Sequence, residues 1–103
     1  MQMIKAIWAW LLRAIKNEYT PEEVNMKLSK LAAANREHLD WRHSIVDLLK
    51  LLQQDSSYSA RKDLANELGY TLQYEGSNKD NTWLHAEIMR RLAMGEITIP
   101  EAK

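Results

Sequence analysis

Hydrophobic residues recur at steps of three and four along most of this chain, which is the period of an amphipathic α-helix. In residues 3–17 this period gathers apolar side chains on one side, and the three cations Lys5, Arg13 and Lys16 fall opposite them. The apolar positions are Ile4, Ile7, Trp8, Leu11, Leu12 and Ile15. The pattern predicts an amphipathic, cationic N-terminal helix.

A second helix is predicted to begin at Thr20, because the residues that follow suit a helix N-terminus. Thr20 can act as the N-cap, Pro21 fits the first helical position, and Glu23 can close a capping box. An apolar stripe follows at Val24, Leu28, Leu31 and Ala32, and the period is lost near residues 35–38.

Two further helical periods meet across a short polar turn in residues 39–70. Asp40 is expected to cap the third helix, and Ser57 is expected to cap the fourth, which Gly69 ends. The third helix would share one face among Trp41, Ile45, Leu48, Leu49 and Leu52, and the fourth would bury Ala60, Leu64, Ala65 and Leu68.

After Tyr70 the period disappears until about residue 80, which predicts a loop longer than the usual helix connection. A fifth helix is expected from Thr82 to Met94, followed by a short tail. The sequence therefore predicts an all-α fold, a compact bundle of about five helices with short connections and one longer loop at about residues 70–81. Its predicted parts are the N-terminal helix (1–18), a helical domain (20–95) and a C-terminal tail (96–103).

Composition narrows the classes of function. The chain has 103 residues, enough for one modest core, and its 14 basic and 14 acidic residues cancel, which disfavours nucleic acid as a partner. No cysteine is present, so disulfides, thiolate metal sites and cysteine nucleophiles are excluded. Lys5, Arg13 and Lys16 interrupt the apolar run near the N-terminus. This run therefore fits neither a membrane-spanning helix nor a signal peptide. We expect a cytoplasmic protein.

Candidate catalytic and ligand-binding residues have simpler explanations. His43, Ser44 and Asp47 resemble parts of a triad, but adjacent helical residues diverge by about a third of a turn, so surface or capping roles are favoured. No two histidines have the i, i+4 spacing of a helical metal site. Residues 41–69 could form a helix-turn-helix, yet Asp63 and Glu67 share its second helix. We predict no enzyme activity, metal or cofactor.

The run LDWR, SIVDLLKLL, DSS, ARK and ELGY within residues 39–70, followed by Trp83-Leu84-His85 and Met89, resembles a bacterial domain-of-unknown-function family. The resemblance covers roughly residues 24–94 and implies a small helical domain, but no activity. Two departures are visible: residues 71–76 replace a compact Gly/Asp/Asn connection, and the family's long linker is nearly absent. We therefore expect the N-terminal helix to pack on the domain or on a second copy.

Two features remain as candidate interaction surfaces. The N-terminal helix has a net charge of about +3, against about −3 for the rest of the chain, and carries Trp8, Trp10, Leu11 and Arg13. The loop after the fourth helix carries Tyr70 and Tyr74, and Tyr74 is expected to be exposed.

These features favour a non-enzymatic interaction or assembly module that binds a protein partner or self-associates through the N-terminal helix. Two alternatives remain. One is a peripheral protein held on the inner membrane by that helix, and the other is an inhibitor of a host protein, encoded by a phage or mobile element.

Overall fold

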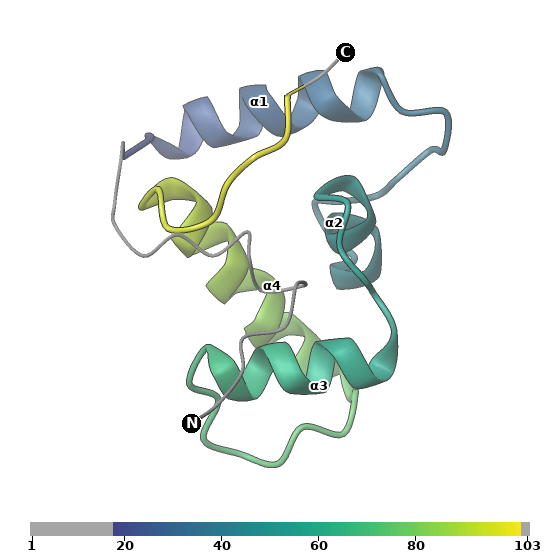
Figure 1. Cartoon of the computed structure of the whole chain (residues 1–103), viewed down its shortest axis with the longest axis vertical. Helices are drawn as coiled ribbons and strands as arrows, with labels where there is room; N and C mark the ends of the chain where they lie inside the picture. The colour runs from purple at the N-terminus through teal and green to yellow at the C-terminus, as the bar shows by residue number, and fades with distance from the viewer. Residues whose placement is uncertain (1–17, 102–103) are drawn as a thin grey trace, which may run out of the picture.

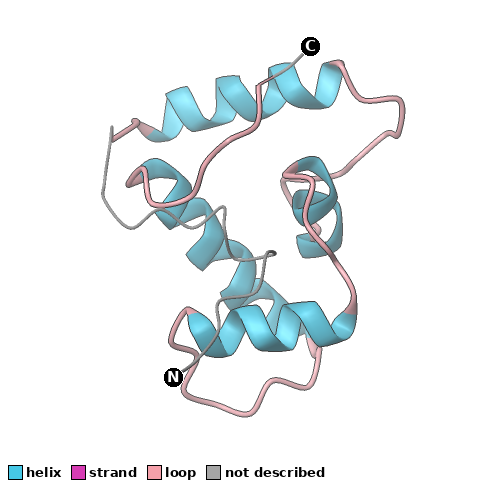
Figure 2. Ribbon diagram, in the orientation of Figure 1, coloured by secondary structure: helices cyan, strands magenta, loops and turns pink. Residues whose placement is uncertain are grey.

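The computed structural model describes residues 18–101. These residues form four α-helices, α1 (Pro21–Ala33), α2 (Ile45–Leu51), α3 (Tyr58–Glu67) and α4 (Asn78–Ala93), joined by loops (Figure 2). The prediction of an all-α fold is confirmed. The count of about five helices is not, because the described part of the chain has four and the helix predicted at residues 3–17 lies outside it.

Helix α1 begins as its sequence predicts. The Glu23 amide donates to the Thr20 hydroxyl at 3.1 Å, and the Thr20 amide donates to the Glu23 carboxylate at 2.8 Å, which completes the capping box. Pro21 occupies the first helical position, where a missing N–H is not needed. These contacts satisfy backbone groups that have no partner inside the helix.

Helix α2 is shorter than predicted, and its cap is Ser44 rather than Asp40. The Asp40 carbonyl accepts from the amides of His43 and Ser44, which closes a turn before the helix starts. The Ser44 hydroxyl accepts from the Asp47 amide at 3.1 Å, while the Asp47 carboxylate accepts from the Asp40 amide at 2.8 Å. Trp41 therefore precedes the helix, although it is buried as expected.

Helix α3 begins after the predicted cap, Ser57, and Gly69 follows its C-terminal end at a φ of +100°, a backbone conformation that favours glycine. Helix α4 starts four residues earlier than the predicted Thr82. Ser77 is its N-cap, and Asp80 completes a second capping box. This shortens the loop predicted at about residues 70–81.

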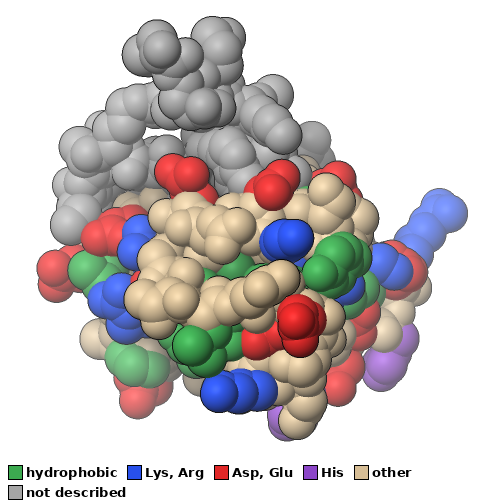
Figure 3. Space-filling view, turned by 90° about the horizontal axis from the view of Figure 1, so that it is seen from below, with side chains coloured by type: hydrophobic (Ala, Val, Ile, Leu, Met, Phe, Trp, Pro, Cys, Tyr) green, Lys and Arg blue, Asp and Glu red, His purple; other side chains and the backbone are tan. Residues whose placement is uncertain are grey.

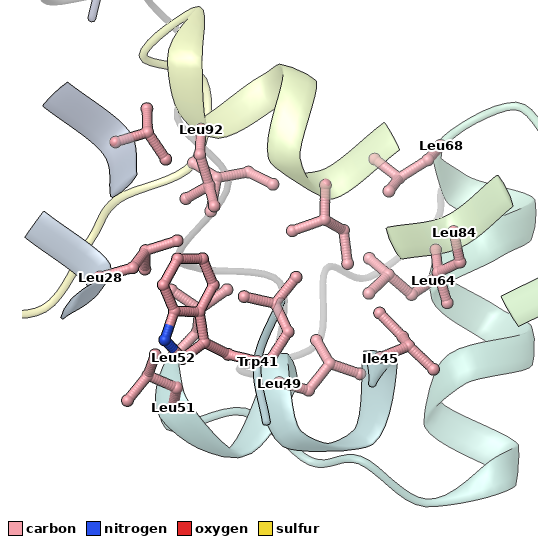
Figure 4. Packing of buried hydrophobic residues seen from close by; sticks show 14 of the residues in the cluster. Leu28, Trp41, Ile45, Leu49, Leu51, Leu52, Leu64, Leu68, Leu84 and Leu92 are labelled. Carbon is pink, nitrogen blue, oxygen red and sulfur yellow. The ribbon is translucent and has the colours of Figure 1, made fainter. Parts of the chain in front are cut away.

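The helices surround one core (Figure 1). Helices α1 and α3 lie at opposite ends of α4, and α2 packs beside α4 and α1. The Tyr19 amide donates to the Ala93 carbonyl at 2.7 Å, which fastens the start of α1 to the end of α4. Figure 4 shows the apolar side chains that meet between the helices. The core includes Leu28, Leu31, Ile45, Leu48, Leu49, Leu51, Leu52, Leu64, Leu68, Leu84, Ile88 and Leu92, together with Ile97 from the tail.

Candidate functional site

Of the six residues predicted as an interaction surface, two lie in the described part of the chain. Trp8, Trp10, Leu11 and Arg13 lie outside the described residues. Tyr70 is half-buried.

The predicted exposure of Tyr74 is wrong, because only 1% of this residue is exposed. Its ring lies near those of Tyr58 and Tyr70, with centroids 6.0 and 6.2 Å away. The large apolar ring belongs to the core, while its hydroxyl has polar partners on α3 and α4, so burial leaves no polar group unsatisfied.

The Tyr74 hydroxyl joins a polar cluster that ties the loop to both neighbouring helices. It donates to the Asn81 side-chain oxygen and accepts from the Arg61 guanidinium at 3.1 Å. Arg61 also donates to the same Asn81 oxygen at 3.0 Å, and the Asn81 amide group donates to the Gly76 carbonyl at 3.2 Å. Burial raises the pKa of Tyr74, so the phenol stays protonated and able to donate.

Asp80 holds the other side of the same loop. Its carboxylate accepts from the Tyr70 hydroxyl, from the Glu75 amide at 2.7 Å and from the Ser77 amide at 3.3 Å. The hydrogen bond from Tyr70 is the main reason that the pKa of Asp80 falls to about 2. The same bond raises the pKa of Tyr70 to about 12. Asp80 therefore stays ionised and joins both ends of the loop to α4.

The fixed loop holds apolar side chains at the surface. Leu72 is 50% exposed, and Tyr58, the first residue of α3, is 45% exposed. The Tyr58 hydroxyl donates to the Tyr74 carbonyl at 3.2 Å, two residues beyond Leu72, so both side chains lie at the α3 end of the molecule. The third large exposed apolar residue among those described, Met26, is 64% exposed on α1.

We call the exposed residues of α3 together with residues 71–77 the α3–loop face. Figure 3 views the molecule from this end and shows hydrophobic side chains among polar side chains and backbone. Its exposed uncharged polar residues are Ser59, Asn66, Thr71, Gln73 and Ser77, and its exposed acids are Asp63, Glu67 and Glu75.

The residues that resembled a triad have structural partners. Ser44 caps α2, as described above, and His43 Nδ1 lies 3.0 Å from an Asp40 carboxylate oxygen at the surface. His85 Nε2 lies 2.7 Å from the Trp41 carbonyl and links α4 to the turn before α2. Within residues 18–101 there is no cluster of three or more His, Cys, Asp or Glu side chains suited to a metal ion. None of the helices in this range is long and apolar enough to cross a membrane.

Several residues of this region were not predicted from the sequence. The pattern Ser77-x-x-Asp80 is a capping-box signal that could have located the start of α4. Leu72 and Tyr74 both stand between polar neighbours in a segment without helical period, so the local sequence does not indicate which of the two is exposed. The contacts of Arg61 with Tyr74 and Asn81 join residues 13 and 20 positions apart, and no local pattern in the sequence indicates them.

Comparison with known proteins identifies a family. Residues 11–100 match the family described as Domain of unknown function (DUF3597). No curated protein matches the chain, and no solved structure matches it.

Proposed function

Since the chain belongs to the DUF3597 family, whose description names no activity, we propose from its geometry that it is a non-enzymatic protein-interaction module. The observation that supports this proposal is Leu72, which is exposed on a loop fixed to α3 and α4 by partly buried polar contacts. The α3–loop face is the proposed binding surface.

The rigidity of the loop favours binding. Ordering a loop on association has an entropic cost, and a loop that is already fixed avoids most of it. Here Asp80 binds the backbone at Glu75 and Ser77, and Asn81 binds the backbone at Gly76. The conformation that displays Leu72 therefore exists before a partner arrives.

The chemistry of the face also suits a protein partner. Tyrosine side chains surrounded by polar residues are typical of the centres of protein interfaces. The polar groups of Asp80, Tyr70 and Tyr74 form hydrogen bonds with other groups of the same fold. Leu72 and Tyr58 are the large apolar side chains that are exposed on this face.

Site-specific cross-linking tests the proposal. A photo-reactive amino acid is placed at Leu72 in the full chain, expressed in the native host, and a control probe is placed at Met26, which is more exposed (64% against 50%) but lies on α1. We expect a discrete protein adduct from position 72 and none from position 26. Equal labelling at both positions, or no protein adduct at position 72, would refute the proposed surface.

A second candidate function, peripheral membrane attachment, rests on a different observation. Residues 1–17 contain three cations, no acid and two tryptophans, a composition that suits a helix lying on anionic lipid. Sedimentation of the full chain with anionic vesicles, weakened by salt and by Trp8→Ala, is the expected result. Absence of binding at low salt would remove this candidate.

A further inference from the structure

We infer that the occupant of the α3–loop face is the N-terminal segment, residues 3–17, of a second copy of this chain. This inference rests on the proposed function, because it names the partner of the same face.

The charges of the two surfaces are complementary. Every acidic residue of the chain lies after Asn17, and residues 1–17 carry only cations. On the α3–loop face, Glu67 and Glu75 are exposed, and neither forms an ion pair with a cation among residues 18–101. Cations placed opposite these carboxylates would favour association and fix its orientation.

The spacing of the charges agrees as well. In the helix that the sequence predicts, Lys5 and Lys16 are eleven residues apart, which is about 16 Å along the axis and about 20° around it. Helix α3 has ten residues, a length of about 15 Å. Glu67 ends this helix, and Glu75 precedes Gly76, which lies against the Tyr58 ring at the helix start.

With the long side chains of the two lysines reaching the two carboxylates, the apolar stripe of the segment would run alongside the line that joins the lysines. That path crosses the side of the molecule on which Leu72 and Tyr58 are exposed. Long lysine side chains can reach carboxylates at the rim of an interface while their helix buries its apolar stripe.

The point where the segment joins the fold favours a second copy over the same chain. Tyr19 is bonded to Ala93 at the C-terminal end of α4, whereas the α3–loop face adjoins the other end of α4 at Asn78 (Figure 1). Helix α4 has 16 residues, so it is about 24 Å long, and a 15-residue helix spans only about 22 Å. In the same chain the segment would use its whole length to reach the face and could not also lie across it.

Mixing of two complementary variants tests the inference in full-length protein. The segment variant carries Trp8→Ser and Leu11→Ser, and the face variant carries Leu72→Ser and Glu67→Lys. Light scattering after size-exclusion chromatography should show wild-type dimers, and each variant alone should associate at least about tenfold more weakly, as expected when interface anchors are removed. A one-to-one mixture should regain dimers, because the intact segment of one copy can bind the intact face of the other.

The control for the face variant, Met26→Ser with Glu22→Lys, makes comparable changes at exposed positions of α1 and should dimerise like the wild type. Monomeric wild type, unchanged dimers in either test variant, or a mixture that stays monomeric would each overturn the inference. Vesicle binding by the segment without dimerisation would overturn it too. If the probe at Leu72 captures a different protein while the wild type is monomeric, the proposed function stands and only the present inference fails.

Discussion

Replacement of Tyr74 by alanine distinguishes a surface loop from a loop that contributes to the core. If Tyr74 were exposed, as the loop composition suggests, the free energy of unfolding would change by no more than about 0.5 kcal/mol. Because Tyr74 is buried against the rings of Tyr58 and Tyr70, its truncation should remove a large apolar contact and leave a cavity.

The expected magnitude follows from the two parts of the side chain. Loss of a buried aromatic ring typically costs about 3–5 kcal/mol. Tyr74→Phe removes only the hydroxyl and should cost about 1 kcal/mol, because Arg61 and Asn81 remain hydrogen-bonded to each other at 3.0 Å. The alanine variant should therefore lose several times as much stability as the phenylalanine variant.

Urea unfolding followed by tryptophan fluorescence measures these differences through the midpoint and the slope of the transition. Met26→Ala is the control, since Met26 is a large apolar residue that is 64% exposed on α1, outside the α3–loop face. It should fall within about 0.5 kcal/mol of wild type. The reasoning fails if Tyr74→Ala is as stable as Met26→Ala.

Three further predictions concern pH, backbone conformation and capping. The pKa of Asp80 is lowered to about 2 from an ordinary 3.8. Its ionised form therefore contributes stability that is present above about pH 4 and lost as pH falls toward 2. Asp80→Asn should flatten this acid dependence of the urea midpoint. The raised pKa of Tyr70, about 12 against 10.0, contributes stability that is present below pH 10 and lost as pH rises toward 12; Tyr70→Phe should flatten the alkaline dependence. Gly69→Ala should cost about 1–2 kcal/mol through its positive φ of 100°, and Gly76→Ala should cost more, because its added carbon would also lie 3.2 Å from the Tyr58 ring. Ser44→Ala should cost about 1 kcal/mol through loss of the α2 cap.

One result would contradict each of these predictions. If the urea midpoint of Asp80→Asn or Tyr70→Phe depended on pH in the same way as that of wild type, the Tyr70–Asp80 bond would not couple folding to protonation. Equal stability of the two glycine variants would contradict the close approach of Tyr58 to Gly76. Ser44→Thr keeps a capping hydroxyl and serves as the control for Ser44→Ala; identical losses in both would argue against capping.

Helix boundaries could be predicted from the sequence where they depend on residues three or four positions apart. The Thr20–Glu23 box and the stop at Gly69 follow from neighbouring residues alone, and both were predicted. Asp40 and Ser44 are both good caps by residue type, and the prediction of Asp40 was wrong because Ser44 caps α2. In the structure the Asp40 amide donates to the Asp47 carboxylate, seven residues away, and Ser44 is the N-cap.

The all-α fold, the apolar stripes and most helix ends follow from the sequence, because periodicity and capping are properties of short segments. The role of the loop after Tyr70 depends on tertiary contacts. A tyrosine between polar residues can point either way, and Tyr74 is buried because α3 and α4 bring Arg61 and Asn81 to its hydroxyl. That same assembly leaves Leu72 at the surface, since a chain fixed on both sides of it cannot turn this side chain into an already filled core.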